Sequence, residues 1–162
     1  DILHGTLHTV MMKGAAWKFV GLEGTELLGA FVHLQGNRLL QELGFFLCKI
    51  SEMIGLTLAE TLKTIPNLKK LIFHNPLSVE NIHWSILLKQ IQTVQLQELE
   101  IRDKALSNEN IRFFSKSISH LTSLLSLDLD FLGNLQIGDE EVSNLCCEGI
   151  KHLISSVHFA FV

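Results

Sequence analysis

The stretches LQELEI at 96–101 and LLSLDL at 124–129 decide how this chain folds. Each has apolar residues at its first, fourth and sixth positions. The same triplet recurs toward the amino terminus at the interval that separates Leu96 from Leu124. It recurs once more toward the carboxyl terminus, two residues later than that interval predicts. The six stretches begin at Met12, Leu40, Leu68, Leu96, Leu124 and Ile154. A fixed period in the range of roughly 20–50 residues is the signature of a repeat protein, in which each unit is one supersecondary element.

Each repeat has a second apolar position about ten residues after the start of its strand, and a helix start follows it. These second positions are Leu22, Ile50, Leu77, Leu106 and Ile137. The residues predicted to cap the helices are Ser51, Ser78, Ser107 and Asp139, because their side-chain oxygens can accept a hydrogen bond from a helix amide. Acidic residues at 52, 80, 109 and 140 suit the first turn of a helix. Each unit is therefore expected to be a strand, a turn, a helix and a tight return.

The pattern predicts one repeat array over residues 1–162. The strands are expected near 12–17, 40–45, 68–73, 96–101, 124–129 and 154–159. Residues 1–11 are expected to be the end of a helix, because their apolar residues lie roughly on one helical face. Neither end has the polar capping unit that repeat proteins usually carry. We therefore expect the chain to be a piece of a longer array.

Composition limits the classes of function. The chain has 47% hydrophobic residues, 19% charged residues and a net charge of −4. Lys and Arg are not in excess, so no nucleic-acid partner is expected. No apolar run approaches the roughly 18 residues of a membrane span, so no membrane partner is expected either. The three cysteines are an odd number, which argues against a disulfide framework and favours the cytoplasm.

The strand pattern L-x-x-L-x-L, the segment IGDEEV at 137–142, and NLKKLIF at 67–73 after TLAETLKTIP carry a family resemblance. The chain resembles ribonuclease-inhibitor-type leucine-rich repeats, such as the C-terminal repeats of NOD-like innate immune receptors. The resemblance implies an α/β fold: a right-handed horseshoe solenoid with parallel strands on the concave face and helices on the convex face. It also implies a protein-interaction module that senses a ligand or holds the parent receptor inactive. The implied partner is a protein or a neighbouring domain of the same chain.

The chain departs from this family at one turn position. The residue eight places after the strand start is often Asn or Cys in the family, where it bonds to the backbone of a neighbouring turn. Here that position holds Val20, Cys48, Pro76, Lys104 and Leu132. Only the cysteine fits, so looser and more variable turns are expected.

Alternate strand residues should face solvent on the concave side, where a partner would bind. The candidate partner-binding residues are Phe46, Lys70, Ile72, His74, Glu98, Glu100, Arg102, Asp128 and Asp130. Among them, four carboxylates are expected to form an acidic patch beside one arginine, and Phe46 and Ile72 to form an exposed apolar pair. Ordinary solvated strand charges and ordinary surface exposure are the competing interpretations.

Enzymatic and metal sites find little support. The chain has no nucleophile elbow, no phosphate-binding loop and no dinucleotide fingerprint, so no enzyme and no cofactor are expected. Its histidines and cysteines lack metal-ligand spacing, and Cys146 and Cys147 are expected to pack as small apolar residues. Two alternatives within the same repeat class are a stand-alone inhibitor or adaptor that binds a basic protein, and a GTPase-activating protein that uses Arg102.

Overall fold

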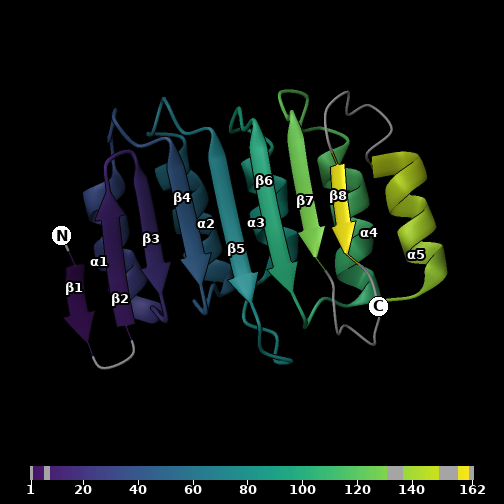
Figure 1. The fold of residues 1–162 in the computed structure, drawn as a ribbon, viewed down its shortest axis with the longest axis horizontal. Helices are drawn as coiled ribbons and strands as arrows, with labels where there is room; N and C mark the ends of the chain where they lie inside the picture. The colour runs from purple at the N-terminus through teal and green to yellow at the C-terminus, as the bar shows by residue number, and fades with distance from the viewer. Residues whose placement is uncertain (1, 6–7, 131–136, 150–156, 161–162) are drawn as a thin grey trace.

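The computed structural model describes residues 2–5, 8–130, 137–149 and 157–160, which form an α/β chain built on a single sheet. Eight strands lie side by side in the order of the chain (Figure 1). The strands are β1 (Ile2–Gly5), β2 (His8–Lys13), β3 (Ala16–Val20), β4 (Glu42–Phe46), β5 (Lys70–Asn75), β6 (Glu98–Asp103), β7 (Ser126–Asp130) and β8 (Val157–Ala160). The helices are α1 (Gly24–Leu34), α2 (Glu52–Leu62), α3 (Trp84–Ile91), α4 (Asn108–Ile118), α5 (Asp139–Asn144) and the π-helical turn η1 (Leu145–Gly149).

The strands from β3 to β8 are parallel, and their register follows the repeat. Lys70 lies beside Glu98, and Glu98 lies beside Ser126, so each residue pairs with its equivalent in the next repeat. Val157 lies beside Leu127, which reproduces the longer last step of the pattern. Equivalent apolar residues therefore stack on one another across the sheet.

The amino-terminal prediction is wrong. A helix was expected over 1–11, but residues 2–5 and 8–13 form strands β1 and β2. Strand β2 pairs antiparallel with β1 on one side and with β3 on the other. A two-residue loop joins β2 to β3, and Gly14 there has φ +59°. Tight hairpin loops need positive φ, which glycine adopts without steric cost. Because this hairpin contains Met12, the first repeat strand is β3, and Ala16 lies beside Glu42, two places later than the period predicts.

The core lies between the sheet and the helices. Leu43, Leu71, Leu99 and Leu127 form one buried row, and Phe19, Phe45, Phe73, Ile101 and Leu129 form the next row. Aromatic rings continue the second row into the helices. The ring centre of Trp84 lies 5.4 Å from that of Phe73 and 5.1 Å from that of Phe114. The core therefore passes without interruption from one repeat to the next.

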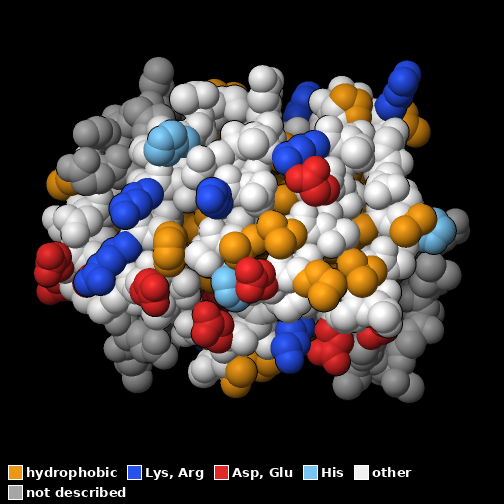
Figure 2. Space-filling model, turned by 180° about the vertical axis from the view of Figure 1, so that it is seen from behind, with side chains coloured by type: hydrophobic (Ala, Val, Ile, Leu, Met, Phe, Trp, Pro, Cys, Tyr) orange, Lys and Arg blue, Asp and Glu red, His pale blue; other side chains and the backbone are white. Residues whose placement is uncertain are grey.

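The two faces of the sheet differ. Helices α1 to α4 lie behind the strands in Figure 1, and within the described part of the chain no helix covers the front face. The helix face carries apolar side chains across its middle, among charged ones (Figure 2). The largest exposed apolar side chains on these helices are Val32, Met53, Leu56 and Phe113. The front of the sheet is the face on which all nine candidate binding residues were expected.

Of the four predicted N-cap residues, two are confirmed and two are not. The hydroxyls of Ser51 and Ser107 accept hydrogen bonds from amides in the first turns of α2 and α4. Ser78 caps nothing, because α3 begins only at Trp84. There Ile82, not the exposed Leu77, takes the core position and bridges to the preceding repeat.

The fifth helix differs from the prediction in two ways. Asp139 is its first residue, and Gly138 is its N-cap. Cys146 and Cys147 are exposed where packing was expected, because in the π-helical turn it is Leu145 that points into the core. Among the described residues, no helix is long and apolar enough to cross a membrane.

Candidate functional site

The candidate site is the uncovered face of β4 to β7. The register places Lys70, Glu98 and Ser126 in one row across the strands, and Ile72, Glu100 and Asp128 in the next. A third row contains His74, Arg102 and Asp130, and Phe46 lies beside His74 on β4. All nine candidate residues therefore belong to one contiguous group of strands.

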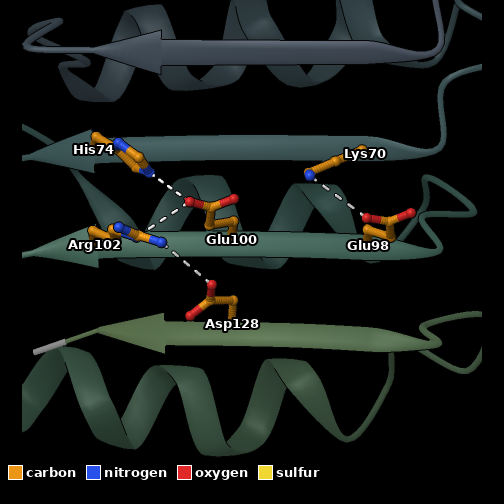
Figure 3. A network of polar contacts seen from close by, with 6 residues as sticks. All are labelled: Lys70, His74, Glu98, Glu100, Arg102 and Asp128. Carbon is orange, nitrogen blue, oxygen red and sulfur yellow. Dashed lines mark hydrogen bonds and ion pairs between the residues drawn. The ribbon is translucent and has the colours of Figure 1, made fainter. Parts of the chain in front are cut away.

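A network of polar contacts joins β5, β6 and β7 (Figure 3). Lys70 Nζ lies 3.6 Å from Glu98 Oε2. His74 Nε2 donates to Glu100 Oε1 at 2.8 Å. Arg102 contacts carboxylates on both sides, with Nε 3.2 Å from Glu100 and Nη2 3.5 Å from Asp128. We call these six residues the sheet-face network.

The sheet-face network corrects the expected acidic patch. Four carboxylates belong to these strands as predicted, but Lys70 and Arg102 supply two cations, and His74 supplies a further donor. About half of the Arg102 side chain and half of the Glu98 side chain is exposed. Surface pairs of this kind contribute little stability, from 0 to about 1 kcal/mol each. Their visible effect is to orient charged groups of opposite sign toward one another across three strands.

The expected exposed apolar pair is also corrected. Ile72 is only 5% exposed, and Phe46 is half-buried. The ring of Phe46 lies over Gly44. A Cβ atom added at Gly44 would come within 2.6 Å of Phe46 Cε2, so a larger residue there would collide with the ring. The same ring packs edge-on against His74 at 4.6 Å, and Lys18 Nζ lies 5.6 Å from its centre. Lys18 therefore belongs to the site, although it was not among the candidates.

The turns after β4, β5 and β6 are more ordered than expected. Cys48 Sγ is buried and donates to the carbonyl of Phe19 at 3.4 Å. In the next two repeats the equivalent role falls one residue before the expected position, to Asn75 and Asp103. Asn75 Nδ2 donates to Val79 O and to Asp103 Oδ1, both at 2.9 Å. The signal was present in the sequence, since Asn75 and Asp103 are themselves one repeat period apart.

Asp103 is a buried carboxylate, only 2% exposed. Burial raises its pKa, and hydrogen bonds from Trp84, Ala105 and Asn75 oppose that shift. The shortest is from Trp84 Nε1 to Oδ2 at 2.7 Å. Burial likewise raises the pKa of the Cys48 thiol to about 11. Asp103 and Trp84 were not singled out from the sequence, because periodicity does not identify a buried charge.

A cavity of about 300 Å³ lies at the carboxyl ends of β4 to β7. Its lining includes Phe46, Leu47, His74, Pro76, Arg102 and Asp130. Most of its exposed wall is apolar, while Arg102 and Lys104 on one hand and Asp103 and Asp130 on the other bring charges of both signs to it. The sheet-face network and this cavity thus share His74 and Arg102.

No group of three or more potential metal ligands occurs among the residues that the structure describes. Comparison with known proteins gives no match: no family profile, no curated protein and no solved structure is significantly similar to the chain.

Proposed function

We propose that this chain is a leucine-rich repeat interaction module, and that the uncovered face of its sheet binds a protein partner. The observation that carries the proposal is the sheet-face network, which holds charged side chains in place on three neighbouring strands. Side chains fixed before binding lose less conformational freedom when a partner arrives. Such a face suits specific recognition.

A right-handed horseshoe solenoid belongs to the same proposal. It is supported by the regular register of β4 to β7 and by the placement of helices α1 to α4 on one face of the sheet. The resemblance to NOD-like receptor repeats extends the proposal to ligand sensing or autoinhibition, with a separate protein or a neighbouring domain as the partner. Three free cysteines support a reducing compartment such as the cytoplasm. In this role the chain has no catalytic activity of its own.

The two alternative functions receive less support from the site. A stand-alone inhibitor or adaptor for a basic protein would need a strongly acidic face, whereas Lys70 and Arg102 offset part of that charge. A GTPase-activating protein would need a cation that can reach a phosphate. Arg102 instead contacts both Glu100 and Asp128.

Photo-crosslinking tests the proposal. A benzophenone amino acid replaces Glu98 on the sheet face, and in a matched variant it replaces Glu60 on the helix face, where the side chain is 71% exposed. In extract from the source organism, we expect the sheet-face probe to give discrete products that an excess of unmodified chain suppresses. Charge reversal at Arg102 should remove those products, because it breaks two contacts of the sheet-face network. Crosslinks from the helix face alone would contradict the proposal.

A further inference from the structure

We infer that the cavity at the carboxyl ends of β4 to β7 receives one aromatic side chain of the partner, either Trp or Tyr. The inference rests on the proposed function and adds the chemistry of the partner's anchoring residue. The cavity's volume of about 300 Å³ is at the lower end of the range of roughly 300–1,000 Å³ for ligand sites. That size suits a single large side chain.

The first argument is the backbone at Leu47. This residue has φ +57°, and it is the one non-glycine residue with positive φ in the described part of the chain. A side chain in this conformation is strained, and glycine would remove the strain. Yet Leu47 lines the cavity with 41% of its surface exposed. A strained residue that leaves apolar surface exposed in a cavity points to a binding role.

The second argument is the fixed position of Arg102. Its guanidinium contacts Glu100 and Asp128 on opposite sides, and it also lines the cavity. A planar cation held in this way can stack on the electron-rich face of an aromatic ring. Lys104 lines the same cavity and is exposed. Asp103 and Asp130 belong to the same lining, so the cavity carries charges of both signs, and the face of the Arg102 guanidinium is what suits an aromatic ring.

The third argument separates Trp and Tyr from Phe. Asp130 lies in the cavity lining, and its carboxylate has several acceptor sites, so besides its existing contact it can accept a hydrogen bond from an indole N–H or a phenol O–H. Buried Trp and Tyr usually need such an acceptor. Trp and Tyr are also the residues that most often dominate binding when they fill a pocket at an interface.

The test uses the full chain and N-acetyl-tryptophanamide as the probe, followed by ¹⁵N nuclear magnetic resonance. We expect saturable binding in the millimolar range, with the largest shifts at the amides of Leu47, His74 and Lys104. Leu47→Gly should keep the fold and weaken binding at least tenfold. The matched control Leu125→Ala alters an exposed leucine just before the opposite end of β7, and it should bind like the wild type.

Three outcomes would overturn the inference: no saturable shift, wild-type affinity in Leu47→Gly, or equal affinity for N-acetyl-leucinamide. Failure here with successful crosslinking from position 98 would leave the proposed function intact and remove only the aromatic anchor. Probe binding without crosslinking would instead contradict the proposed function, because the cavity would then be a site for a small aromatic ligand.

Discussion

Replacement of Trp84 by Phe should be among the most destabilising conservative substitutions in this protein. The indole ring is 1% exposed and packs between Phe73 and Phe114, so it links the third and fourth repeats. Its N–H donates to buried Asp103 at 2.7 Å. Loss of a hydrogen bond to a charged group costs about 1.5–3 kcal/mol. The smaller ring adds roughly 1–2 kcal/mol of lost packing, for a total of about 3–5 kcal/mol.

The size of this effect should depend on pH. The hydrogen bond from Trp84 favours the ionised form of Asp103 and lowers its pKa, against the larger effect of burial. The substitution therefore raises that pKa further and costs most where Asp103 is ionised. As pH falls and Asp103 becomes protonated, the cost should shrink toward the packing contribution alone.

Wild-type Asp103 should itself make stability depend on pH. Its pKa is higher in the folded state than the ordinary value of 3.8, so the folded state binds the proton more tightly. Its contribution to stability is therefore favourable at low pH and is lost as pH rises from about 4 through the raised pKa. Asp103→Asn should remove this component of the pH dependence.

Urea unfolding followed by circular dichroism, at pH 5 and pH 8, measures these effects in wild type, Trp84→Phe, Asp103→Asn and the double variant. We expect the two substitutions to be non-additive at pH 8, with a coupling of about 1–3 kcal/mol. An equal cost of Trp84→Phe at both pH values, together with additivity, would refute a role for the hydrogen bond. It would leave the ring with a packing role only.

Three further predictions use matched pairs or internal controls. Leu127→Ala should lower the free energy of unfolding in urea by about 2–5 kcal/mol, because Leu127 is fully buried. Leu125→Ala, at a position that is 53% exposed, should be nearly neutral. Equal costs for the two substitutions would contradict the register of β7. Ser107→Ala should cost about 1 kcal/mol because it removes a helix cap, whereas Ser78→Ala should leave the unfolding midpoint unchanged. Cys48 should resist a thiol reagent at pH 8 in the folded protein, because burial raises its pKa to about 11. The exposed Cys146 and Cys147 should react under the same conditions. Rapid modification of all three cysteines would show that Cys48 is accessible.

The strand register was predictable because three strong apolar residues recur in each central repeat. Leu71, Leu99 and Leu127 are buried neighbours in the sheet. In the first repeat the pattern predicted the wrong position for the strand, because Met12 and Ala15 match the apolar triplet only weakly. A hairpin needs few contacts distant in sequence, and Gly14 supplies its turn, so local structure shifted the first strand by two places.

The alternation of residues along each strand predicted which side chains belong to the candidate site. It did not predict which of them are buried or paired. Ile72 and Glu100 occupy equivalent positions in neighbouring strands, yet only Ile72 is buried. Alternation assigns both to the same face and cannot show how the ring of Phe46 folds over Gly44. The turns also differ from expectation for a three-dimensional reason. Asn75 and Asp103 are the paired last residues of β5 and β6, one residue before the family position, and their side chains form a hydrogen bond.

The hairpin of β2 and β3 gives the sheet a direction of assembly. Its strands are joined by a two-residue loop, whereas each later strand must find a partner in the preceding repeat, beyond an intervening helix or loop. Closing a longer loop costs more entropy, and contacts close in sequence form faster. We therefore expect β3 to be positioned early, with an edge ready to receive β4, and the remaining strands to add in chain order. During synthesis this hairpin would emerge before β4 to β8.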